Sequence, residues 1–173
     1  MPARTDAFDL RGLHLSSGAG RRLGLGVAIE PFMLGGERYE VAPRLVRVKL
    51  EVSRTTGEGY ALALRFEASL TGPCMRCLEP AAPLLEVSSR EVSQPGDAAE
   101  LRSPYLQDEV LDLHAWARDA LALSLPTQVL CRPDCAGLCA ECGANLNEAG
   151  PAHGHERDQR DQRWAKLSQL RLE

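Results

Sequence analysis

The chain has 173 residues, a length that fits one domain or one domain with an appendage. Hydrophobic residues make up 44% of it and aromatic residues only 5%, so a core must rest on leucine, valine and alanine. The net charge of −4 argues against a generic nucleic-acid binder. However, residues 1–54 carry nine basic and six acidic side chains, whereas residues 55–130 carry five and eleven. The first third could offer a basic face to phosphate, whereas the acidic middle of the chain would repel phosphate.

The first residues do not resemble an export signal. Residues 1–15 contain Asp6, Asp9 and Arg11 and lack the apolar stretch of a signal peptide. The chain also has no apolar run long enough to span a bilayer. We therefore expect a cytoplasmic protein without membrane contact, in which clustered cysteines stay reduced and favour a metal over disulfides.

The clearest local pattern is a pair of runs in which apolar residues alternate with other residues. Residues 46–52 and 60–70 alternate in this way, and a glycine-containing turn at residues 54–59 separates them. This pattern predicts an antiparallel hairpin. A third strand over residues 84–92 would extend the hairpin into a meander. Weaker strand candidates precede it, at residues 10–15 and 23–29.

Cys74 and Cys77 lie in the run Gly-Pro-Cys-Met-Arg-Cys-Leu-Glu-Pro, and Pro73 and Pro80 bracket them, which predicts a turn between extended segments. Three hypotheses compete for this pair. It could be a redox dithiol, although no βαβ pattern surrounds it, and we expect no oxidoreductase activity. It could donate ligands to a metal further along the chain or to a second one. Otherwise it is structural, or part of a contact surface with Arg76 exposed between the thiols.

A helix is predicted over residues 112–124, after a polar stretch at residues 94–103. Asp112 is a natural N-cap, and Pro126 ends the helical pattern. The apolar stripe at helical spacing consists of Leu113, Trp116, Ala117, Ala120 and Leu121.

Four cysteines within twelve residues form the most informative motif of the chain. Thiolates at such short spacing can converge on one tetrahedral Zn²⁺, and Gly143 gives the second Cys-x-x-Cys the shape of a zinc knuckle. The spacing predicts a single structural zinc. Its ligands would be Cys131, Cys135, Cys139 and Cys142.

A competing ligand set uses the two histidines that follow. His153 and His155 could bind the metal together with Cys139 and Cys142, because imidazole and thiolate both suit zinc. Further on, Trp164, Leu167 and Leu170 recur every third residue, which predicts a short amphipathic helix over residues 161–172.

These patterns predict an α+β fold. We expect an antiparallel β-meander or small open barrel packed by one helix, with a C-terminal zinc-binding tail and a short terminal helix. The β-rich core domain, with helix 112–124, would cover residues 1–127. The cysteine-rich tail would cover residues 128–173.

Motifs of common enzyme classes are missing. The sequence has no Gly-rich phosphate loop after a strand, no His-Glu-x-x-His and no Gly-x-Ser-x-Gly. Zinc ligands are in surplus, which favours a closed structural site over a catalytic site with an open position. We therefore expect a binding protein without a small-molecule substrate, not an enzyme.

Three motifs carry a resemblance to a known family. They are Cys-x-Arg-Cys-Leu-Glu-Pro at residues 74–80, an acidic Leu-rich helix ending in Leu-x-Leu-Pro at residues 123–126, and Cys-x-x-x-Cys-x-Gly-Leu-Cys-x-x-Cys-Gly-x-x-Leu-Asn at residues 131–147. In their order and separation, over about residues 40–170, they resemble the YceD family of large ribosomal RNA subunit accumulation proteins. Family members often carry Cys-x-Cys and Asp-Pro-Arg where this chain has His153-x-His155 and Asp161-Gln-Arg163.

The resemblance implies a role in accumulation or maturation of large-subunit (23S) ribosomal RNA and in assembly of the large ribosomal subunit. It implies no catalytic activity, and it implies that zinc supports the structure. The partner would be precursor RNA, a ribosomal protein, or both. Phosphate would meet the strand surface with Arg44, Arg47, Lys49 and Arg76. The alternative is a zinc-stabilised protein-interaction or redox-sensing module without RNA contact.

Overall fold

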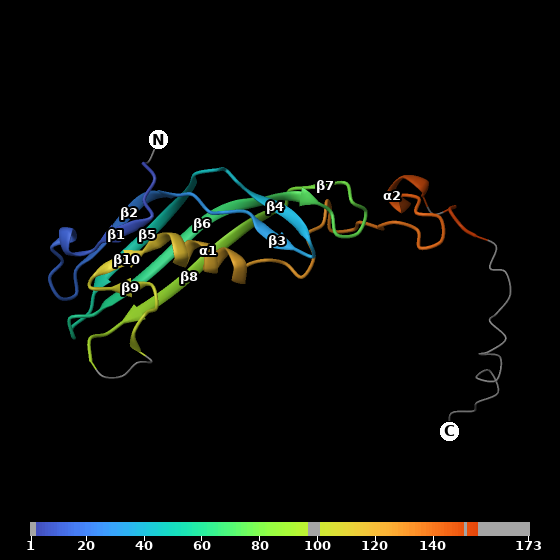
Figure 1. The fold of residues 1–173 in the computed structure, drawn as a ribbon. Coiled ribbons are helices and arrows are strands. Elements are labelled where there is room, and N and C mark those ends of the chain that lie inside the picture. Colours follow the sequence, from blue (N-terminus) through green and yellow to red (C-terminus); the bar gives the residue numbers. More distant parts are fainter. Residues whose placement is uncertain (1–2, 97–100, 151, 156–173) are drawn as a thin grey trace, which may run out of the picture.

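A computed structural model describes residues 3–96, 101–150 and 152–155 (Figure 1). Its main element is an open antiparallel sheet in which the central strand order is β2-β5-β6-β4-β3, and β7 and β8 also pair with β6. The strands are β2 (Gly20–Val27), β3 (Phe32–Leu34), β4 (Glu37–Ala42), β5 (Val46–Arg54), β6 (Tyr60–Pro73), β7 (Pro80–Ala81) and β8 (Leu84–Ser93).

The predicted hairpin is confirmed as β5 and β6, and the predicted third strand is confirmed as β8. In the register of this meander Leu50 pairs with Leu64 on β6, and Ser89 of β8 lies on the other side of Leu64. Every second residue of β5 and β6 is buried, as the alternation predicts. No described pairing joins the edge strands β2 and β8, so the sheet is open and not a closed barrel.

One face of the sheet is covered by α1 (Leu113–Leu123), which lies across β8 in Figure 1. The helix prediction is confirmed, including its cap: the side chain of Asp112 accepts a hydrogen bond from the backbone N–H of Ala115 at 2.8 Å. Trp116 is buried against the sheet, and its indole N–H donates to the hydroxyl of Ser89 at 2.9 Å. A small sheet in the order β1-β10-β9 leads into the helix. Its strands are β1 (Ala7–Asp9), β9 (Leu106–Gln107) and β10 (Val110–Asp112).

The opposite face of β2, β5, β6 and β8 is solvent-exposed along most of its length. Because side chains alternate between the two faces of a strand, the residues between the buried ones point away from α1. We call this surface the open face. Its charged side chains are Arg22, Arg47, Lys49, Glu51, Arg65, Glu67, Glu86 and Arg90.

Two features of the first forty residues differ from the sequence-based expectation. Residues 10–15 do not form a strand; residues Arg11–Leu13 form a single 3-10 turn, and the preceding Leu10 is buried in the core. The hairpin of β3 and β4 was not predicted. Gly35 and Gly36, which both have positive φ, form its turn, and a Gly-Gly pair between two β-prone runs is a usable hairpin signal.

The described chain narrows beyond the sheet into a tip at the right-hand side of Figure 1. We define the tip as residues 74–79, which connect β6 to β7, together with residues 128–150 and 152–155. It includes the one-turn helix α2 (Leu146–Ala149). The predicted helix over residues 161–172 lies outside the described residues, and the division into units 1–127 and 128–173 stays a prediction. No described helix combines the length and apolar character needed to cross a membrane.

Candidate metal centres

The tip forms because the chain after α1 returns to the end of β6. The backbone N–H of Met75 donates to the carbonyl of Val129 at 2.9 Å, and the N–H of Leu138 donates to the carbonyl of Arg76 at 3.2 Å. These two bonds place the later cysteines beside the turn that carries Cys74 and Cys77.

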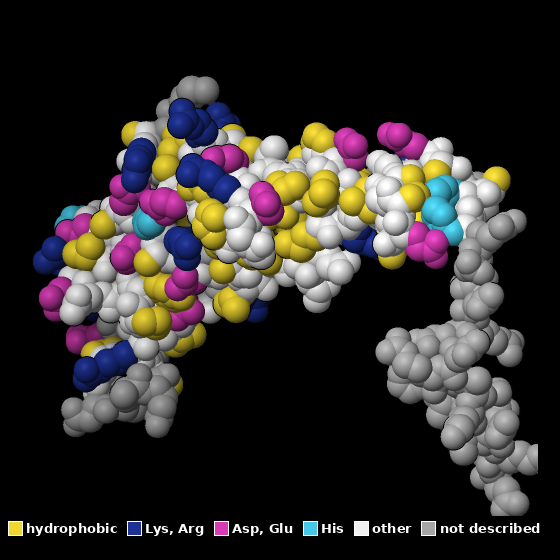
Figure 2. Space-filling view, turned by 45° about the vertical axis from the view of Figure 1, so that its right-hand side comes forward, with side chains coloured by type: hydrophobic (Ala, Val, Ile, Leu, Met, Phe, Trp, Pro, Cys, Tyr) yellow, Lys and Arg dark blue, Asp and Glu magenta, His cyan; other side chains and the backbone are white. Residues whose placement is uncertain are grey.

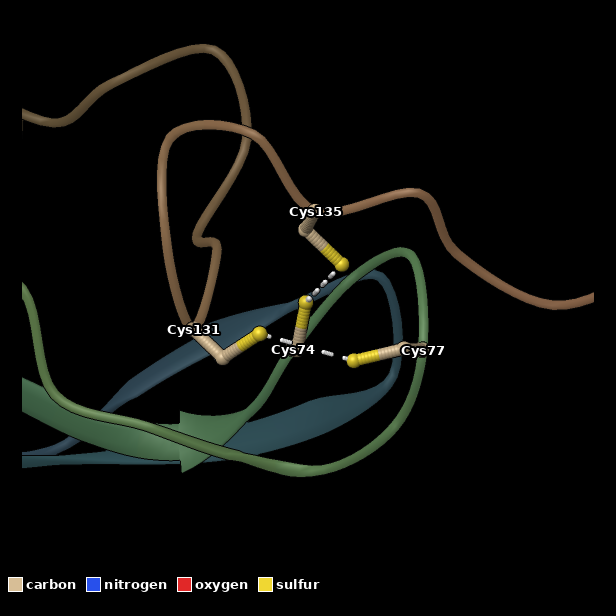
Figure 3. A group of neighbouring side chains, drawn as sticks. All are labelled: Cys74, Cys77, Cys131 and Cys135. Atoms are coloured by element: carbon tan, nitrogen blue, oxygen red, sulfur yellow. Dashed lines mark hydrogen bonds between the residues drawn. The ribbon is translucent and has the colours of Figure 1, made fainter. Parts of the chain in front are cut away.

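The first candidate centre, the inner group, consists of Cys74, Cys77, Cys131 and Cys135 (Figure 3). The four sulfurs lie within 4.8 Å of one another, with 3.8 Å between Cys74 and Cys135 and 3.6 Å between Cys77 and Cys131. Four sulfurs at about 2.3 Å from a tetrahedral ion are separated by about 3.8 Å, so this spacing fits a metal. A disulfide needs about 2.05 Å, and all six cysteines are free.

The second candidate centre, the outer group, consists of Cys139, Cys142, His153 and His155. The Nε2 of His155 lies 3.2 Å from Cys139 Sγ, the Nε2 of His153 lies 3.5 Å from Cys142 Sγ, and the two Nε2 atoms are 3.1 Å apart. A tetrahedral zinc with two sulfur and two nitrogen ligands separates such atoms by about 3.3–3.6 Å. Histidine side chains are visible at the surface of this end of the molecule in Figure 2.

The structure does not bring together the four cysteines that the spacing predicted as one ligand set. Cys131 and Cys135 lie with the earlier Cys-x-x-Cys pair, and Cys139 and Cys142 lie with the two histidines. The physical reason is that the backbone bond from Leu138 to Arg76 pins the chain between Cys135 and Cys139 against the β6–β7 turn, so the two halves of the motif face different partners. The competing set with His153 and His155 is the arrangement found.

The two Cys-x-x-Cys turns have the same local structure. In the first, the N–H of Leu78 donates to the carbonyl of Cys74 at 3.0 Å; in the second, the N–H of Gly143 donates to the carbonyl of Cys139 at 2.9 Å. Both donor residues have left-handed backbones, with φ of 64° at Leu78 and 73° at Gly143. Glycine adopts this conformation without strain, whereas leucine does not.

Backbone amides in both turns stabilise thiolate charge. Burial acts to raise the pKa of Cys74, but hydrogen bonds from the backbone of Arg76, Cys77 and Cys131 outweigh it and lower the pKa to about 6. Hydrogen bonds from the backbone of Cys142 and the side chain of His153 lower the pKa of Cys139 to about 6. By contrast, burial and the neighbouring thiols raise the pKa of Cys131 to about 12. Thiolates crowded in this way need a cation to ionise together.

Two further side chains support ligand atoms. The amide of Asn147 donates to Cys135 Sγ at 3.5 Å, and this bond is the main cause of the lowered pKa of Cys135. Glu141 places a carboxylate oxygen 3.5 Å from Nδ1 of His155, on the ring side opposite the candidate ligand atom Nε2. Such partners hold a histidine in the orientation and tautomer that bind metal.

The two groups differ in burial. Cys74 is 0% exposed and Cys135 1% exposed, whereas Cys142 and His155 of the outer group are exposed. Each group offers four protein ligands, which leaves no tetrahedral position open for a substrate or an activated water. Both arrangements therefore suit a structural ion.

Comparison with known proteins places the chain in a family. The family model described as "Large ribosomal RNA subunit accumulation protein YceD" matches residues 62–171. The chain belongs to the YceD family. The match includes all but the first two residues of β6, the whole of α1 and every residue of both candidate centres.

The chain is also similar to proteins from mycobacteria and from maize. An uncharacterised protein of Mycobacterium tuberculosis (strain ATCC 25618 / H37Rv) is 37% identical over 122 residues, which cover 67% of this chain and 58% of that protein. One from Mycobacterium leprae (strain TN) is 31% identical over 171 residues, 87% of this chain and 73% of that protein. A maize protein named "Large ribosomal RNA subunit accumulation protein YCED homolog 1, chloroplastic" is 42% identical over 40 residues, 23% of this chain and 14% of that protein.

The chain thus spans little more than half the length of the M. tuberculosis relative. No solved structure matches the chain.

Metal content distinguishes the two-group arrangement from the single site that the spacing predicted. Protein purified without added metal is expected to carry about two zinc ions per chain, since each group supplies four ligands. Cys74→Ser and Cys142→Ser should each remove one ion, measured by elemental analysis. One ion per chain that survives Cys74→Ser would instead support the set Cys131, Cys135, Cys139 and Cys142.

Chelation is expected to loosen the tip and leave the sheet folded. The hairpin of β5 and β6 and helix α1 bury their apolar side chains without help from a metal, unlike an isolated zinc finger, whose folding depends on the ion. Amide hydrogen exchange should speed up over residues 128–155 but not over residues 46–70. A cooperative loss of the whole far-ultraviolet circular dichroism signal on chelation would contradict this.

Alanine variants are usually more stable than glycine variants at the same position. At Leu78 we expect the opposite order of stability, because its backbone is strained. Leu78 has φ of 64° and is 66% exposed, so truncating its side chain removes little packing. Leu78→Ala keeps the strain of a left-handed Cβ, while Leu78→Gly relieves it. The glycine variant should therefore be more stable than the alanine variant by about 1 kcal/mol.

Denaturant unfolding of the metal-loaded proteins measures this difference. Leu84→Ala and Leu84→Gly, at an exposed position of β8, provide the control pair and should show the opposite order.

Proposed function

We propose that this chain is a non-catalytic cytoplasmic factor for accumulation of large-subunit (23S) ribosomal RNA and assembly of the large ribosomal subunit, and that it binds RNA with the open face of its sheet. Family membership supports the ribosomal role, since the family description and the maize relative both name large ribosomal RNA subunit accumulation. The observation that carries the RNA contact is a pair of like charges at the centre of the open face.

Lys49 of β5 and Arg65 of β6 are directly opposite each other in the antiparallel register, and both are exposed. Like charges in this position repel and destabilise a sheet. Neither side chain forms an ion pair with a described carboxylate. A bound anion would relieve this repulsion, and phosphate is the anion that an RNA backbone presents.

The surroundings of the pair leave room for a nucleic-acid backbone. Gly24 of β2 lies beside Lys49, and Ser88 of β8 lies beside Arg65, so the row is flanked by small residues on both sides. Basic residues outnumber acidic ones on the whole face. The basic set is Arg22, Arg47, Lys49, Arg65 and Arg90, and the acidic set is Glu51, Glu67 and Glu86.

Of the four basic residues that the sequence analysis assigned to one surface, only two lie on the open face. Arg47 and Lys49 lie on the open face, as their alternation with buried valines indicated. Arg44 lies in the connection between β4 and β5, and Arg76 lies in the tip, so neither belongs to the row of Lys49 and Arg65. The alternation over residues 60–70 also places Arg65 on the exposed side of its strand, but only the pairing of the strands sets it opposite Lys49 and brings Arg90 to the same face.

Zinc is the metal that best suits the two candidate centres. Thiolate and imidazole ligands at tetrahedral spacing favour zinc over the hard cations magnesium and calcium, which take oxygen ligands. We infer that both ions are structural. The inner ion would tie residues 131–135 to the end of β6, and the outer ion would close the loop from Cys139 to His155.

The alternative function, a zinc-stabilised protein-interaction or redox-sensing module without RNA contact, is favoured by apolar side chains at the tip. Leu78, Met75 and Leu138 are 66%, 39% and 37% exposed. Figure 2 shows hydrophobic side chains along the narrow part of the molecule that leads to the tip. A protein partner would use these side chains, whereas an RNA partner would use the open face.

Neutralising the central basic pair is expected to weaken RNA binding. The double variant Lys49→Gln, Arg65→Gln should bind large-subunit ribosomal RNA fragments less tightly. Its salt dependence should be shallower by about one unit for each phosphate that is no longer bound. Filter binding over a salt series measures both effects. Far-ultraviolet circular dichroism should show an unchanged fold, since both side chains are exposed.

The matched control neutralises the acidic pair on the same face. Glu67 and Glu86 are also directly opposite each other, so Glu67→Gln, Glu86→Gln removes a like-charged pair of the other sign. This variant should bind RNA as well as the parent or better. If the basic-pair variant binds like the parent while Met75→Asp, Leu78→Asp abolishes association with large-subunit precursors, the RNA contact is wrong and the protein-binding alternative holds.

A further inference from the structure

Asn147 connects the two candidate metal centres. It lies in α2, on the loop that joins Cys142 to His153 of the outer group. Its side chain nevertheless contacts the inner group: Nδ2 donates to Cys135 Sγ at 3.5 Å, while Oδ1 accepts a hydrogen bond from the backbone N–H of Ala136 at 2.8 Å. One amide from the outer loop therefore holds both a ligand sulfur of the inner group and the residue that follows it.

The orientation of this amide follows from its partners. A backbone N–H can only donate, so the atom facing Ala136 is the carbonyl oxygen. The NH₂ group then faces Cys135 Sγ, and its other contact is the side-chain oxygen of Asn145 at 2.8 Å, again an acceptor. A donor aimed at a thiolate stabilises its negative charge, which is how residues around a metal site tune its ligands.

Backbone contacts hold the outer loop against the inner group. The N–H of Leu146 donates to the carbonyl of Gly137 at 2.9 Å, and the N–H of Cys139 donates to the carbonyl of Ala144 at 2.8 Å. Gly137 itself has φ of 82°, and a Cβ there would lie 3.2 Å from the carbonyl oxygen of Arg76 in the inner turn. The loop that carries Asn147 thus contacts Gly137, which in turn packs against the turn that carries Cys74 and Cys77.

We propose that Asn147 couples the two metal centres, so that an ion in the outer group strengthens binding of an ion in the inner group. An outer ion fixes Cys142 and His153, which flank the loop of α2, and thereby holds the amide of Asn147 against Cys135. By linkage, an ion in the inner group strengthens outer binding by the same factor. The coupling rests on metal binding by both groups and is independent of the RNA contact.

Cobalt(II) titration tests the coupling, because cobalt replaces zinc in such sites and its absorption spectrum distinguishes four sulfur ligands from two sulfur and two nitrogen ligands. The key variant is Asn147→Asp, which keeps an oxygen to accept from Ala136 but removes the donor to Cys135. We expect inner-site affinity to fall by about 10–100-fold. The sulfur-to-cobalt charge-transfer band of the inner site should also shift, which a merely structural role of Asn147 would not cause.

A double-mutant cycle isolates the coupling from the direct effect. Cys142→Ala removes an exposed outer ligand and should weaken inner-site binding in the parent background. In the Asn147→Asp background the same change should have no further effect on the inner site. Glu148→Gln, an exposed neighbour in α2, is the control and should leave both sites unchanged.

Three results would overturn the proposal. If Cys142→Ala weakens inner-site binding equally in the parent and in Asn147→Asp, the coupling belongs to the backbone contacts and not to Asn147. No weakening in the parent would make the centres independent, and an unchanged inner site in Asn147→Asp would remove the role of Asn147. If the parent protein does not bind cobalt at all, the metal centres themselves are refuted. That result would leave the proposed RNA contact of the open face untouched, because filter binding tests it independently.

Discussion

Backbone hydrogen bonding along both edges of β6 is the interaction on which the rest of the structure depends. This strand runs from Tyr60 to Pro73 and pairs with β5 and β4 on one side and with β8 and β7 on the other. One of its faces supplies core residues under α1, and the other contributes Arg65 to the open face. Its end carries Cys74 into the tip. The core, the open face and the inner group are thus positioned by one strand.

The tip shows how a protein extends beyond the reach of its apolar core. Past the end of β6, the described chain has few large apolar side chains to bury, and Leu78 and Met75 are exposed. Metal ligands can replace a core in such small segments, because binding of the ion provides the free energy that apolar burial does not. The two candidate groups follow one another along the tip: the buried inner group joins residues 131–135 to the end of β6, and the outer group lies around the loop of α2.

The open face and the tip are separate surfaces with different chemistry. The open face has more basic than acidic side chains and contains the like-charged pair of Lys49 and Arg65, whereas the tip exposes apolar side chains at its turns and carries the candidate metal ligands. The two surfaces lie on different parts of the molecule: the open face on the sheet, and the tip beyond the end of β6.

The sequence by itself determined the elements whose signals are local. Alternation over residues 46–70 predicted the hairpin because strand burial has a period of two residues, and Asp112 with its apolar stripe predicted α1 because a helix has its own period and cap. Cysteine and histidine spacing also predicted that metal ligands gather near the C-terminus. The β3–β4 hairpin was missed although its Gly-Gly turn is equally local.

Tertiary structure alone decided which ligands and charges meet. Cys77 and Cys131 are 54 residues apart, and only the return of the chain after α1 to the end of β6 brings their sulfurs together. Short spacing suggested that Cys131 and Cys135 share a site with Cys139 and Cys142, but the structure places the pairs in different groups, and the backbone bond from Leu138 to Arg76 lies between them. Likewise, Lys49 faces Arg65 only through the register of β5 against β6. Spacing along a chain limits which side chains can meet, whereas hydrogen bonds between distant segments select the ones that do.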